Sequence, residues 1–332
     1  MEIEGRPVPT PSAKNESAPL TGSPRTPRRK APVQDNFSNK FLTMLKRSTM
    51  PKAQKPSVTI KANKNAANDR REDDLGLSDL VVEELVQHAV EQETINTFLQ
   101  PIMKLPQRRI EYYEMYARIR ARPGVYMPAS RYIDIARQSN LVSRIDNILL
   151  EETIKVLRGT EHMEKAAPFF MNITGASLKD KNFMNTLLLF AARNRTLTGR
   201  IVLEMPQKEF ENLSAPVRKI MMALTQLGCT FSIDHVQNLN IDEEILQTLG
   251  VRFIKIPART FLSRAQKDTE FAQLKHLRAR LGKAGIKVIA EKIESDKTLL
   301  ELADYDIGYG QGNALAKPDM QSAFEGQYQQ RA

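Results

Sequence analysis

Three things are scarce in this 332-residue sequence: cysteine, long apolar runs and, between residues 5 and 71, negative charge. Cys229 is the single cysteine, which excludes an internal disulfide framework and suits a reducing compartment. No run approaches the ~18 consecutive apolar residues of a membrane-spanning helix. The N-terminus also lacks the apolar core of a secretory signal peptide. The sequence therefore predicts a soluble, cytoplasmic protein.

The shortage of acids marks a distinct N-terminal segment. Residues 5 to 71 carry 15 Lys and Arg against three acids, whereas the rest of the chain carries 34 bases and 36 acids. The overall formal charge of +10 therefore originates in this segment. Nine of the 18 prolines lie at or before Pro56, and the only aromatic residues before position 75 are Phe37 and Phe41. Such a composition buries too little apolar surface to fold, so residues 1–75 are predicted to be a disordered basic tail.

The tail contains one candidate binding segment, residues 36–48. Phe37, Phe41, Leu42 and Leu45 fall at helical spacing beside basic residues, a pattern suited to an acidic protein partner or an anionic membrane surface. Binding there would recruit the protein to the membrane periphery, and chance clustering in a linker is the alternative. No specific nucleic-acid binding is expected, because aromatic stacking residues are nearly absent.

Residues 76–95 are predicted to form a lead-in helix. Val82, Val86 and Val90 recur every four residues, Ser78 is a suitable N-cap, and acids occupy the first turns. The helix is expected to run to about Glu93 and to pack on the domain that follows. A homodimer formed through this helix is the rival interpretation.

From residue 96 to 320, short β-rich runs alternate with amphipathic helices, which is typical of βα units. The predicted strands are 97–102, 110–119, 169–173, 201–205, 230–236, 253–256 and 288–293, and the clear helices are 128–138, 144–157, 215–227 and 271–284. The length is close to the ~250 residues of a (β/α)₈ barrel. We expect a TIM-like barrel, with an open doubly wound sheet as the alternative and residues 321–332 as a flexible C-terminus.

Polar residues within the apolar strands favour the barrel. They are Glu114, Asn172, Glu204, Asp234, Lys255 and Glu291, most of them near a strand's carboxyl end. A buried carboxylate costs several kcal/mol unless it is paired or bound to a cation. A barrel brings strand ends to one face, where these groups would form a site for hard cations and phosphate. The alternative is a set of unrelated polar groups that face solvent.

At these residues the sequence resembles the EAL domain, a bacterial family of cyclic di-GMP phosphodiesterases. The similar segments are FLQPI, YYEMYARIR, FMNIT, IVLEM, FSIDHV, FIKI, VIAEKIE and GYGQGNALAKP, in that order. The resemblance implies an EAL-type (β/α)₈ barrel, cyclic di-GMP as ligand and hydrolysis to linear pGpG. It also implies a role for each matching residue: Glu114, Asn172, Glu204 and Asp234 as ligands for Mg²⁺ or Mn²⁺; Lys255 and Glu291 as catalytic residues; Gln100, Arg118 and Gln311 as nucleotide contacts.

The sequence departs from the family pattern in several places. The signature tripeptide reads Glu114-Met115-Tyr116, and an early helical segment reads Ala136-Arg137-Gln138. His235 replaces the second of two adjacent aspartates, the following loop (Gln237, Asn238) lacks the family's glycines, Gln207 replaces a glutamate, and Pro257 replaces an aspartate. An aspartate and an imidazole hold a pair of Mg²⁺ ions poorly, because Mg²⁺ prefers oxygen ligands.

These departures predict a degenerate EAL-domain signalling protein. We expect an effector or scaffold that binds cyclic di-GMP or a related nucleotide with little hydrolytic activity. The alternatives are an active phosphodiesterase and a protein-interaction scaffold that binds no nucleotide.

Overall fold

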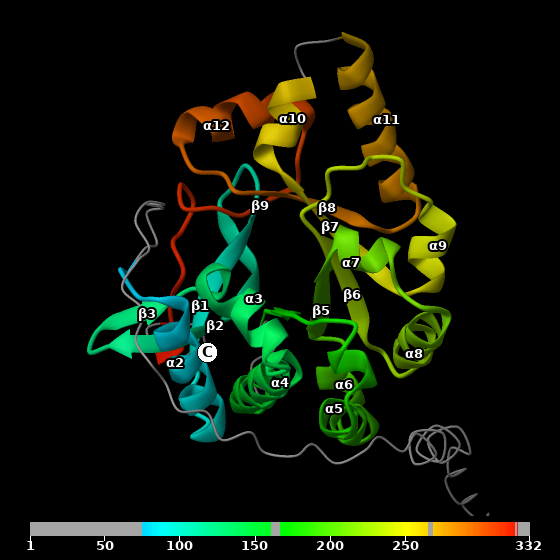
Figure 1. The fold of residues 1–332 in the computed structure, drawn as a ribbon. Helices are drawn as coiled ribbons and strands as arrows, with labels where there is room; N and C mark the ends of the chain where they lie inside the picture. Colours follow the sequence, from blue (N-terminus) through cyan, green and yellow to red (C-terminus); the bar gives the residue numbers. More distant parts are fainter. Residues whose placement is uncertain (1–74, 161–166, 265–267, 323, 325–332) are drawn as a thin grey trace, which may run out of the picture. The chain divides into compact units, whose positions relative to one another are not determined.

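The computed structural model describes residues 75–160, 167–264, 268–322 and 324 (Figure 1). The predicted tail and nearly all of the predicted C-terminal segment lie outside these residues, so both stay predictions. Within the described part of the chain, no helix combines the length and the apolar character needed to cross a bilayer.

Eight strands close into a barrel. Going round it, they are β1 (Asn96–Lys104), β2 (Arg109–Arg122), β4 (Phe169–Asn172), β5 (Ile201–Pro206), β6 (Thr230–Asp234), β7 (Val251–Pro257), β8 (Lys287–Glu291) and β9 (Tyr309–Gly310). The strands from β2 to β9 are parallel, whereas β1 runs antiparallel to β2 on one side and to β9 on the other. The predicted barrel is thereby confirmed and the open sheet is excluded. Two short strands, β3 (Val125–Met127) and β10 (Asp319–Met320), extend the sheet beyond the closed ring.

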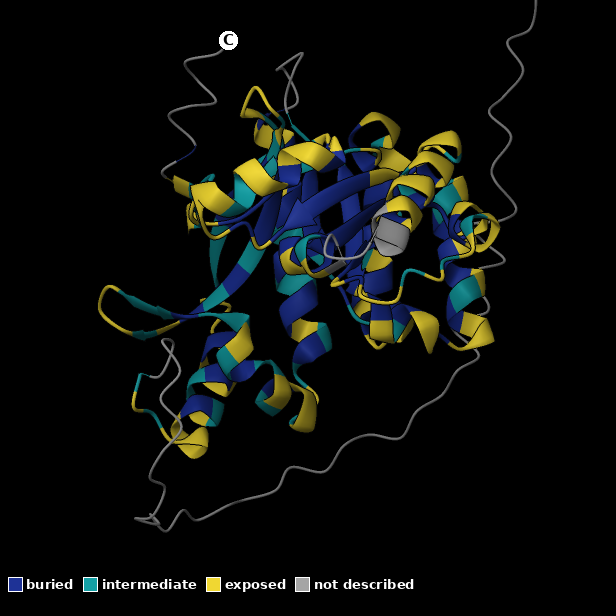
Figure 2. Cartoon of the chain, turned by 90° about the horizontal axis from the view of Figure 1, so that it is seen from above, coloured by how far each residue is buried: buried dark blue, intermediate teal, exposed yellow. Residues whose placement is uncertain are grey.

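Helices surround the strands, with buried faces toward the barrel and exposed faces outward (Figure 2). They are α2 (Asp79–Glu91), α3 (Ala129–Gln138), α4 (Val142–Gly159), α5 (Lys181–Arg193), α6 (Arg195–Thr198), α7 (Gln207–Glu211), α8 (Ala215–Gln226), α9 (Glu243–Thr248), α10 (Ala258–Arg264), α11 (Asp268–Lys283) and α12 (Asp296–Glu301), with short 3₁₀ turns η1 (Ser177–Lys179) and η2 (Leu302–Tyr305). In α2, Ser78 caps the first turn through Val81 N, and the predicted valines are buried.

The barrel interior changes from apolar to polar along its axis. At the amino ends of the parallel strands, a buried cluster fills the barrel: Ile102, Tyr112, Phe170, Val202, Phe253 and Ile289, with Tyr309 packed against it. The next inward positions along β2, β4 and β7 are Glu114, Asn172 and Lys255, because inward-facing residues recur every second position. The apolar layer therefore forms the floor beneath the polar groups.

Two predicted strands end earlier than expected. Strands 230–236 and 288–293 stop at Asp234 and Glu291, since the next residues, His235 and Lys292, have φ angles of 54° and 57°. A left-handed backbone cannot continue an extended strand.

The helices and strands that the sequence analysis did not predict are short or lie in continuously apolar segments. Strand β9 has only two residues, too few for a periodic pattern. Helix α5 contains the run 187–190 (LLLF), in which a helical period is hidden. The remaining unpredicted helices, α6, α7, α9, α10 and α12, are seven residues or shorter.

Candidate functional site

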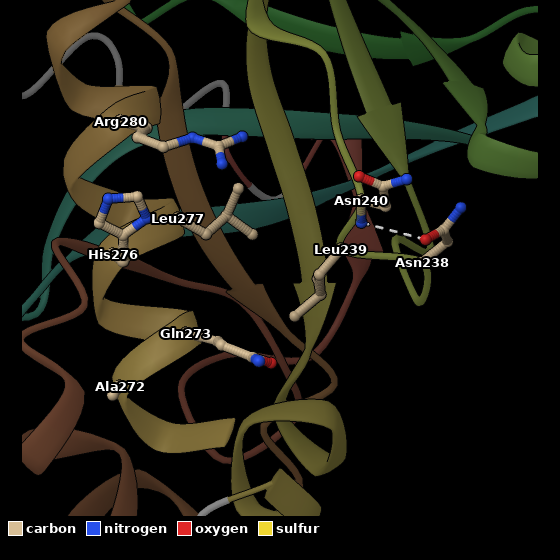
Figure 3. A pocket seen from close by; sticks show the side chains of 8 residues that line it. All are labelled: Asn238, Leu239, Asn240, Ala272, Gln273, His276, Leu277 and Arg280. Atoms are coloured by element: carbon tan, nitrogen blue, oxygen red, sulfur yellow. Dashed lines mark hydrogen bonds between the residues drawn. The ribbon is translucent and has the colours of Figure 1, made fainter. Parts of the chain in front are cut away.

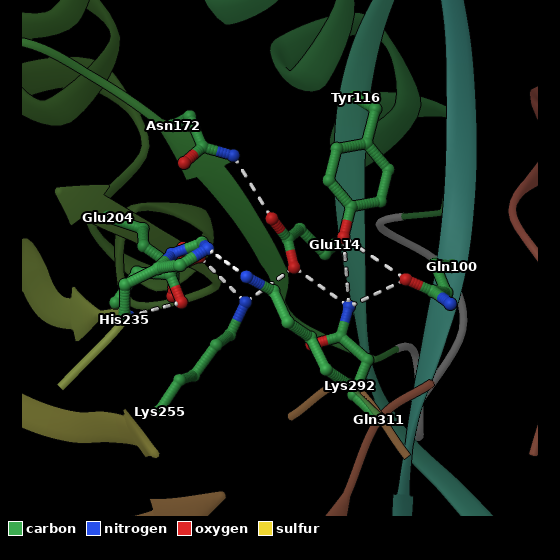
Figure 4. Close-up of polar contacts among 10 residues, drawn as sticks. Gln100, Glu114, Tyr116, Asn172, Glu204, His235, Lys255, Lys292 and Gln311 are labelled. Carbon is green, nitrogen blue, oxygen red and sulfur yellow. Dashed lines mark hydrogen bonds and ion pairs between the residues drawn. The ribbon is translucent and has the colours of Figure 1, made fainter. Parts of the chain in front are cut away.

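The structure gathers eight of the nine predicted site residues into one polar cluster at the barrel mouth: Gln100, Glu114, Asn172, Glu204, Asp234, Lys255, Glu291 and Gln311. Figure 4 labels six of them: Gln100, Glu114, Asn172, Glu204, Lys255 and Gln311. The ninth, Arg118, lies on β2 two residues beyond Tyr116. The individual roles assigned from the family resemblance stay predictions.

Lys255 is the centre of the cluster. Its Nζ donates to Glu114 Oε2 at 2.5 Å and to Glu204 Oε1 at 2.6 Å, and the side chain is 1% exposed. Burial favours the neutral amine, but the charges of Glu114, Glu204 and Asp234 outweigh it and raise the pKa of Lys255. Burial also raises the pKa of Glu204, against the attraction of Lys255. The lysine is therefore a fixed ammonium that neutralises buried carboxylates.

Two amides complete the wall beside Glu114. Gln311 Nε2 donates to Glu114 Oε2 at 2.7 Å and to Gln100 Oε1 at 3.1 Å. Gln100 Nε2 is held by the carbonyl of Ala316 at 2.9 Å, and Tyr116 OH donates to Gln100 Oε1 at 3.1 Å. Both glutamines are thus oriented by protein partners before any ligand arrives.

Gly312 sets the position of Gln311. Its φ is 154°, and a Cβ there would lie 2.3 Å from the backbone N and O of Ile293. Only glycine permits this approach, which allows Gln311 to lie against the end of β8.

Asp234 is paired with its neighbour rather than with Lys255. One carboxylate oxygen accepts from the backbone N of His235 at 2.8 Å, and the other is paired with His235 Nδ1. Burial alone would raise the pKa of Asp234, but the His235 hydrogen bonds and the charge of Lys255 lower it. The same side-chain bond raises the pKa of His235. On the far side of the ring, Nε2 lies 2.5 Å from Lys292 Nζ.

Arg118 differs from the other cations in the mouth. Its guanidinium lies 5.2 Å from the centre of the Phe98 ring, and its Nε is buried. Among the described residues it has no hydrogen-bond acceptor and no ion-pair partner. A half-buried guanidinium without a partner is suited to an anion supplied from outside.

The donor set fits one hard divalent cation. Glu204 Oε2 and Glu291 Oε1 are buried and have no hydrogen-bond partner in the part of the chain that the structure describes. Such oxygens are costly unless a ligand satisfies them, and carboxylate and amide oxygens are what Mg²⁺ and Mn²⁺ prefer. Asn172, Glu204 and Asp234 lie on the consecutive strands β4, β5 and β6, respectively, and would share such an ion.

The same residues do not fit a second ion. Asp234, His235 and Glu291 can present one ligand atom each within 4.8 Å of one another. However, Nδ1 of His235 is engaged by Asp234, Nε2 is engaged by Lys292, and the Lys292 ammonium adds positive charge there. A second cation would have to displace these contacts.

Residues that the sequence analysis did not assign also shape the site. Gln207 appeared there only as a lost glutamate, but its Nε2 donates to Asn238 O at 2.7 Å and its Oε1 accepts from the backbone N of Gln237 and of Asn238. It therefore holds the loop after β6. Tyr116 and Lys292 were also missed. The two-residue spacing of Tyr116 from Glu114 was an available signal, whereas nothing in the sequence pointed to Lys292.

A buried carboxylate holds the loop after Asn172. Asp146 on α4 accepts from Ser177 Oγ at 2.5 Å and from Thr174 N at 3.1 Å. Burial raises its pKa to about 7, although these hydrogen bonds lower it. The native state therefore binds this proton more tightly than the unfolded chain does. The resulting stabilisation is complete below the unfolded pKa of ~3.9 and is lost as the pH rises through the folded value.

We expect Asp146→Asn to flatten the pH dependence of stability. In the wild type, this group lowers the free energy of unfolding by up to ~1.4 kcal/mol per pH unit between the two pKa values, and Asn removes that component. Urea denaturation across this pH range measures the slope, with Asp134→Asn, an exposed acid, as the control. Equal slopes for wild type and Asp146→Asn would contradict the assignment.

A separate hollow lies outside this cluster. It has a volume of about 690 Å³ and lies between the loop after β6 and helix α11 (Figure 3). Its lining includes Asn238, Leu239, His276 and Arg280 but no carboxylate and none of the predicted site residues. The chemistry therefore places the functional site at the barrel mouth, although this hollow is large.

The fold and the cluster define a (β/α)₈ barrel protein with an acidic, lysine-centred site at its mouth. The chain belongs to the EAL domain family, whose model matches residues 83–318.

Among its relatives, an uncharacterized 76.5 kDa protein of Thiocystis violacea is 24% identical over 75% of this chain and 35% of its own length. The cyclic di-GMP phosphodiesterase PdeA of Borreliella burgdorferi is 20% identical over 70% of this chain and 34% of its own length. The chain thus spans about a third of the length of these curated relatives.

Solved structures show the same fold. The Xanthomonas citri FimX EAL domain in complex with c-diGMP is 18% identical with a TM-score of 0.63, over 73% of this chain and 94% of that one. The PaMucR phosphodiesterase in its c-di-GMP complex is 16% identical with a TM-score of 0.64, over 73% of this chain and 99% of that one.

Proposed function

We propose that this chain binds cyclic di-GMP at the barrel mouth and hydrolyses it slowly or not at all. The observation that carries the proposal is the combination of an unpartnered Arg118 guanidinium with the His235–Lys292 pair where the family has a second carboxylate. The first favours binding of a phosphate, and the second opposes a two-metal mechanism. Relatives named cyclic di-GMP phosphodiesterases and EAL domains solved with c-di-GMP support this choice of ligand.

Each predicted residue has a distinct part in this proposal. Arg118 would hold a phosphate through two parallel N–H donors, and the pre-oriented Gln100 and Gln311 would line the nucleotide's path. A single bound Mg²⁺ or Mn²⁺, held by Glu204, Asn172 and Asp234 with Glu114 beside them, would acidify a water for the residual hydrolysis.

Lys255 and Glu291 occupy the family's catalytic positions. Lys255 stays protonated, because its carboxylate neighbours raise its pKa, so it can orient a water but cannot take its proton. Burial, with the charge of Asp234, raises the pKa of Glu291 to about 7, which would let it accept a proton near neutral pH.

We expect hydrolysis of cyclic di-GMP to stay far below ordinary enzymatic rates of about 1 s⁻¹ with either Mg²⁺ or Mn²⁺. His235→Asp alone is not expected to restore full activity, because the Gln237–Asn238 loop held by Gln207 remains and Lys292 still brings its charge. Chromatographic detection of pGpG formation measures this. Turnover at ordinary rates by the wild type would contradict the proposal.

An active phosphodiesterase is the second candidate. It is favoured by the unpartnered Glu204 Oε2, which is suited to a metal ion, and by the intact Lys255, Glu114 and Glu204 triad. Calorimetric titration with cyclic di-GMP, with and without Mg²⁺, separates the candidates when combined with the turnover assay. Binding without turnover supports a receptor, and binding with turnover supports the phosphodiesterase. The absence of both binding and turnover supports a scaffold that binds no nucleotide.

A further inference from the structure

We propose that His235 and Lys292 form a built-in cationic subsite for one phosphate of the bound nucleotide, in place of a second metal ion. The inference rests on the proposed binding of cyclic di-GMP and adds its mode of charge compensation. Its consequence is that nucleotide binding does not require a divalent cation.

The backbone conformation at the ends of β6 and β8 places these two side chains close to each other. Each directly follows a buried strand-end acid, His235 after Asp234 and Lys292 after Glu291, and each takes a left-handed conformation. That conformation is sterically unfavourable for most residues that carry a Cβ. The two turns bring His235 Nε2 and Lys292 Nζ to 2.5 Å across the mouth (Figure 4). Unfavourable backbone conformations cluster at functional sites.

The hydrogen-bond pattern leaves positive charge available to a ligand. When the ring is neutral, Nδ1–H donates to Asp234, so Nε2 accepts from the Lys292 ammonium. The ammonium then keeps its other N–H donors. The pair therefore presents the positive charge of Lys292 to a ligand.

The pair is also accessible to a ligand. The His235 side chain is 44% exposed, and Lys292 is exposed. Lys292 makes no ion pair with any residue that the structure describes. This contrasts with Lys255, which is 1% exposed and bound to two carboxylates. Lys255 is therefore committed to two buried carboxylates, whereas the exposed Lys292, whose charge also acts on Glu291, can still approach a ligand.

A phosphate bound at the barrel mouth requires a nearby cation, because carboxylates surround it. A phosphodiester anion that enters the mouth meets the strand-end carboxylates Asp234 and Glu291, which lie in one cluster with His235. Like charges at close range in a partly buried site repel strongly, and a nearby ammonium offsets that repulsion. The family's solution is a metal ion, whereas this chain holds an ammonium and an imidazole there.

The test is calorimetric titration of the full chain with cyclic di-GMP in EDTA and in excess Mg²⁺. We expect wild-type affinity to differ by less than about threefold between the two buffers and Lys292→Met to weaken it by about tenfold or more in EDTA, equivalent to ~1.4 kcal/mol. Lys292→Arg should retain most of the affinity. Lys297→Met, which removes an 85% exposed lysine on the neighbouring helix α12, is the matched control and should bind like the wild type.

The outcomes separate this inference from the proposed function. Wild-type binding that Lys292→Met leaves unchanged, or that EDTA abolishes, overturns the built-in subsite while the receptor function stands. Absence of wild-type binding in both buffers overturns the receptor function and this inference with it. His235→Asp adds an independent readout, because an acid beside Asp234 should make nucleotide affinity increase with Mg²⁺.

Discussion

Arg118→Ala is expected to weaken cyclic di-GMP binding by about 10- to 100-fold. A hydrogen bond to a charged group contributes ~1.5–3 kcal/mol, and each ~1.4 kcal/mol is a factor of ten in affinity. The guanidinium has no competing acceptor among the described residues, so its donors are available to a phosphate. Its stacking on Phe98 keeps it oriented before the ligand arrives. Isothermal titration calorimetry measures the change.

Two further variants make the Arg118 result specific. Arg109→Ala removes an exposed arginine from the opposite end of the same strand and should leave affinity unchanged. Arg118→Lys keeps the charge but loses the planar pair of donors, so an intermediate affinity is expected. If Arg118→Ala binds as tightly as the wild type, phosphate recognition lies elsewhere in the mouth.

Lys255→Met is expected to lower the free energy of unfolding by about 3–5 kcal/mol, because it leaves two buried carboxylates without their cation. Glu204 is fully buried and Glu114 is 4% exposed, so water cannot replace the lysine without opening the barrel. Chemical denaturation measures the loss. The comparison is with Lys297→Met, where exposure predicts a change within about 0.5 kcal/mol.

A compensated variant distinguishes lost charge pairing from a simple packing defect. Combining Lys255→Met with Glu114→Gln and Glu204→Gln removes the buried charges together and should recover much of the stability. A single variant within about 1 kcal/mol of the wild type would show that the cluster is not a buried ion network. Because Lys255→Met is expected to destabilise the fold, its effect on nucleotide binding is interpretable only under conditions where the variant remains folded.

Two lysines occupy different positions in the site: Lys255 lies inside the acid cluster and Lys292 lies at its rim. Lys255 is bound to Glu114 and Glu204, whereas the Lys292 ammonium lies against the His235 ring and attracts the charge of Glu291. Under the proposed function, they would together supply charge compensation that does not depend on loading with a second metal ion. Such a site would favour binding of an anion over its hydrolysis, since an ammonium cannot activate a water as a divalent metal ion does.

The alternation of strands and helices was readable from the sequence because periodicity is local. Val82, Val86 and Val90 predicted α2, and the apolar runs around Glu114, Glu204 and Lys255 predicted β2, β5 and β7. The embedded polar residues predicted a shared face, since a buried charge demands a partner. These inferences require only the neighbours of each residue along the chain.

The tertiary structure alone decided which polar groups pair with one another as hydrogen-bond or ion-pair partners. Lys255 lies 141 residues from Glu114 in sequence and 2.5 Å away in space, and Gln311 reaches Glu114 across 197 residues. The left-handed turns at His235 and Lys292, with φ angles of 54° and 57° directly after β6 and β8, were not predicted from the sequence. Hydrogen-bond partners between distant strands depend on barrel closure and register, so the pairing of His235 with Lys292 becomes visible only when the strands are assembled.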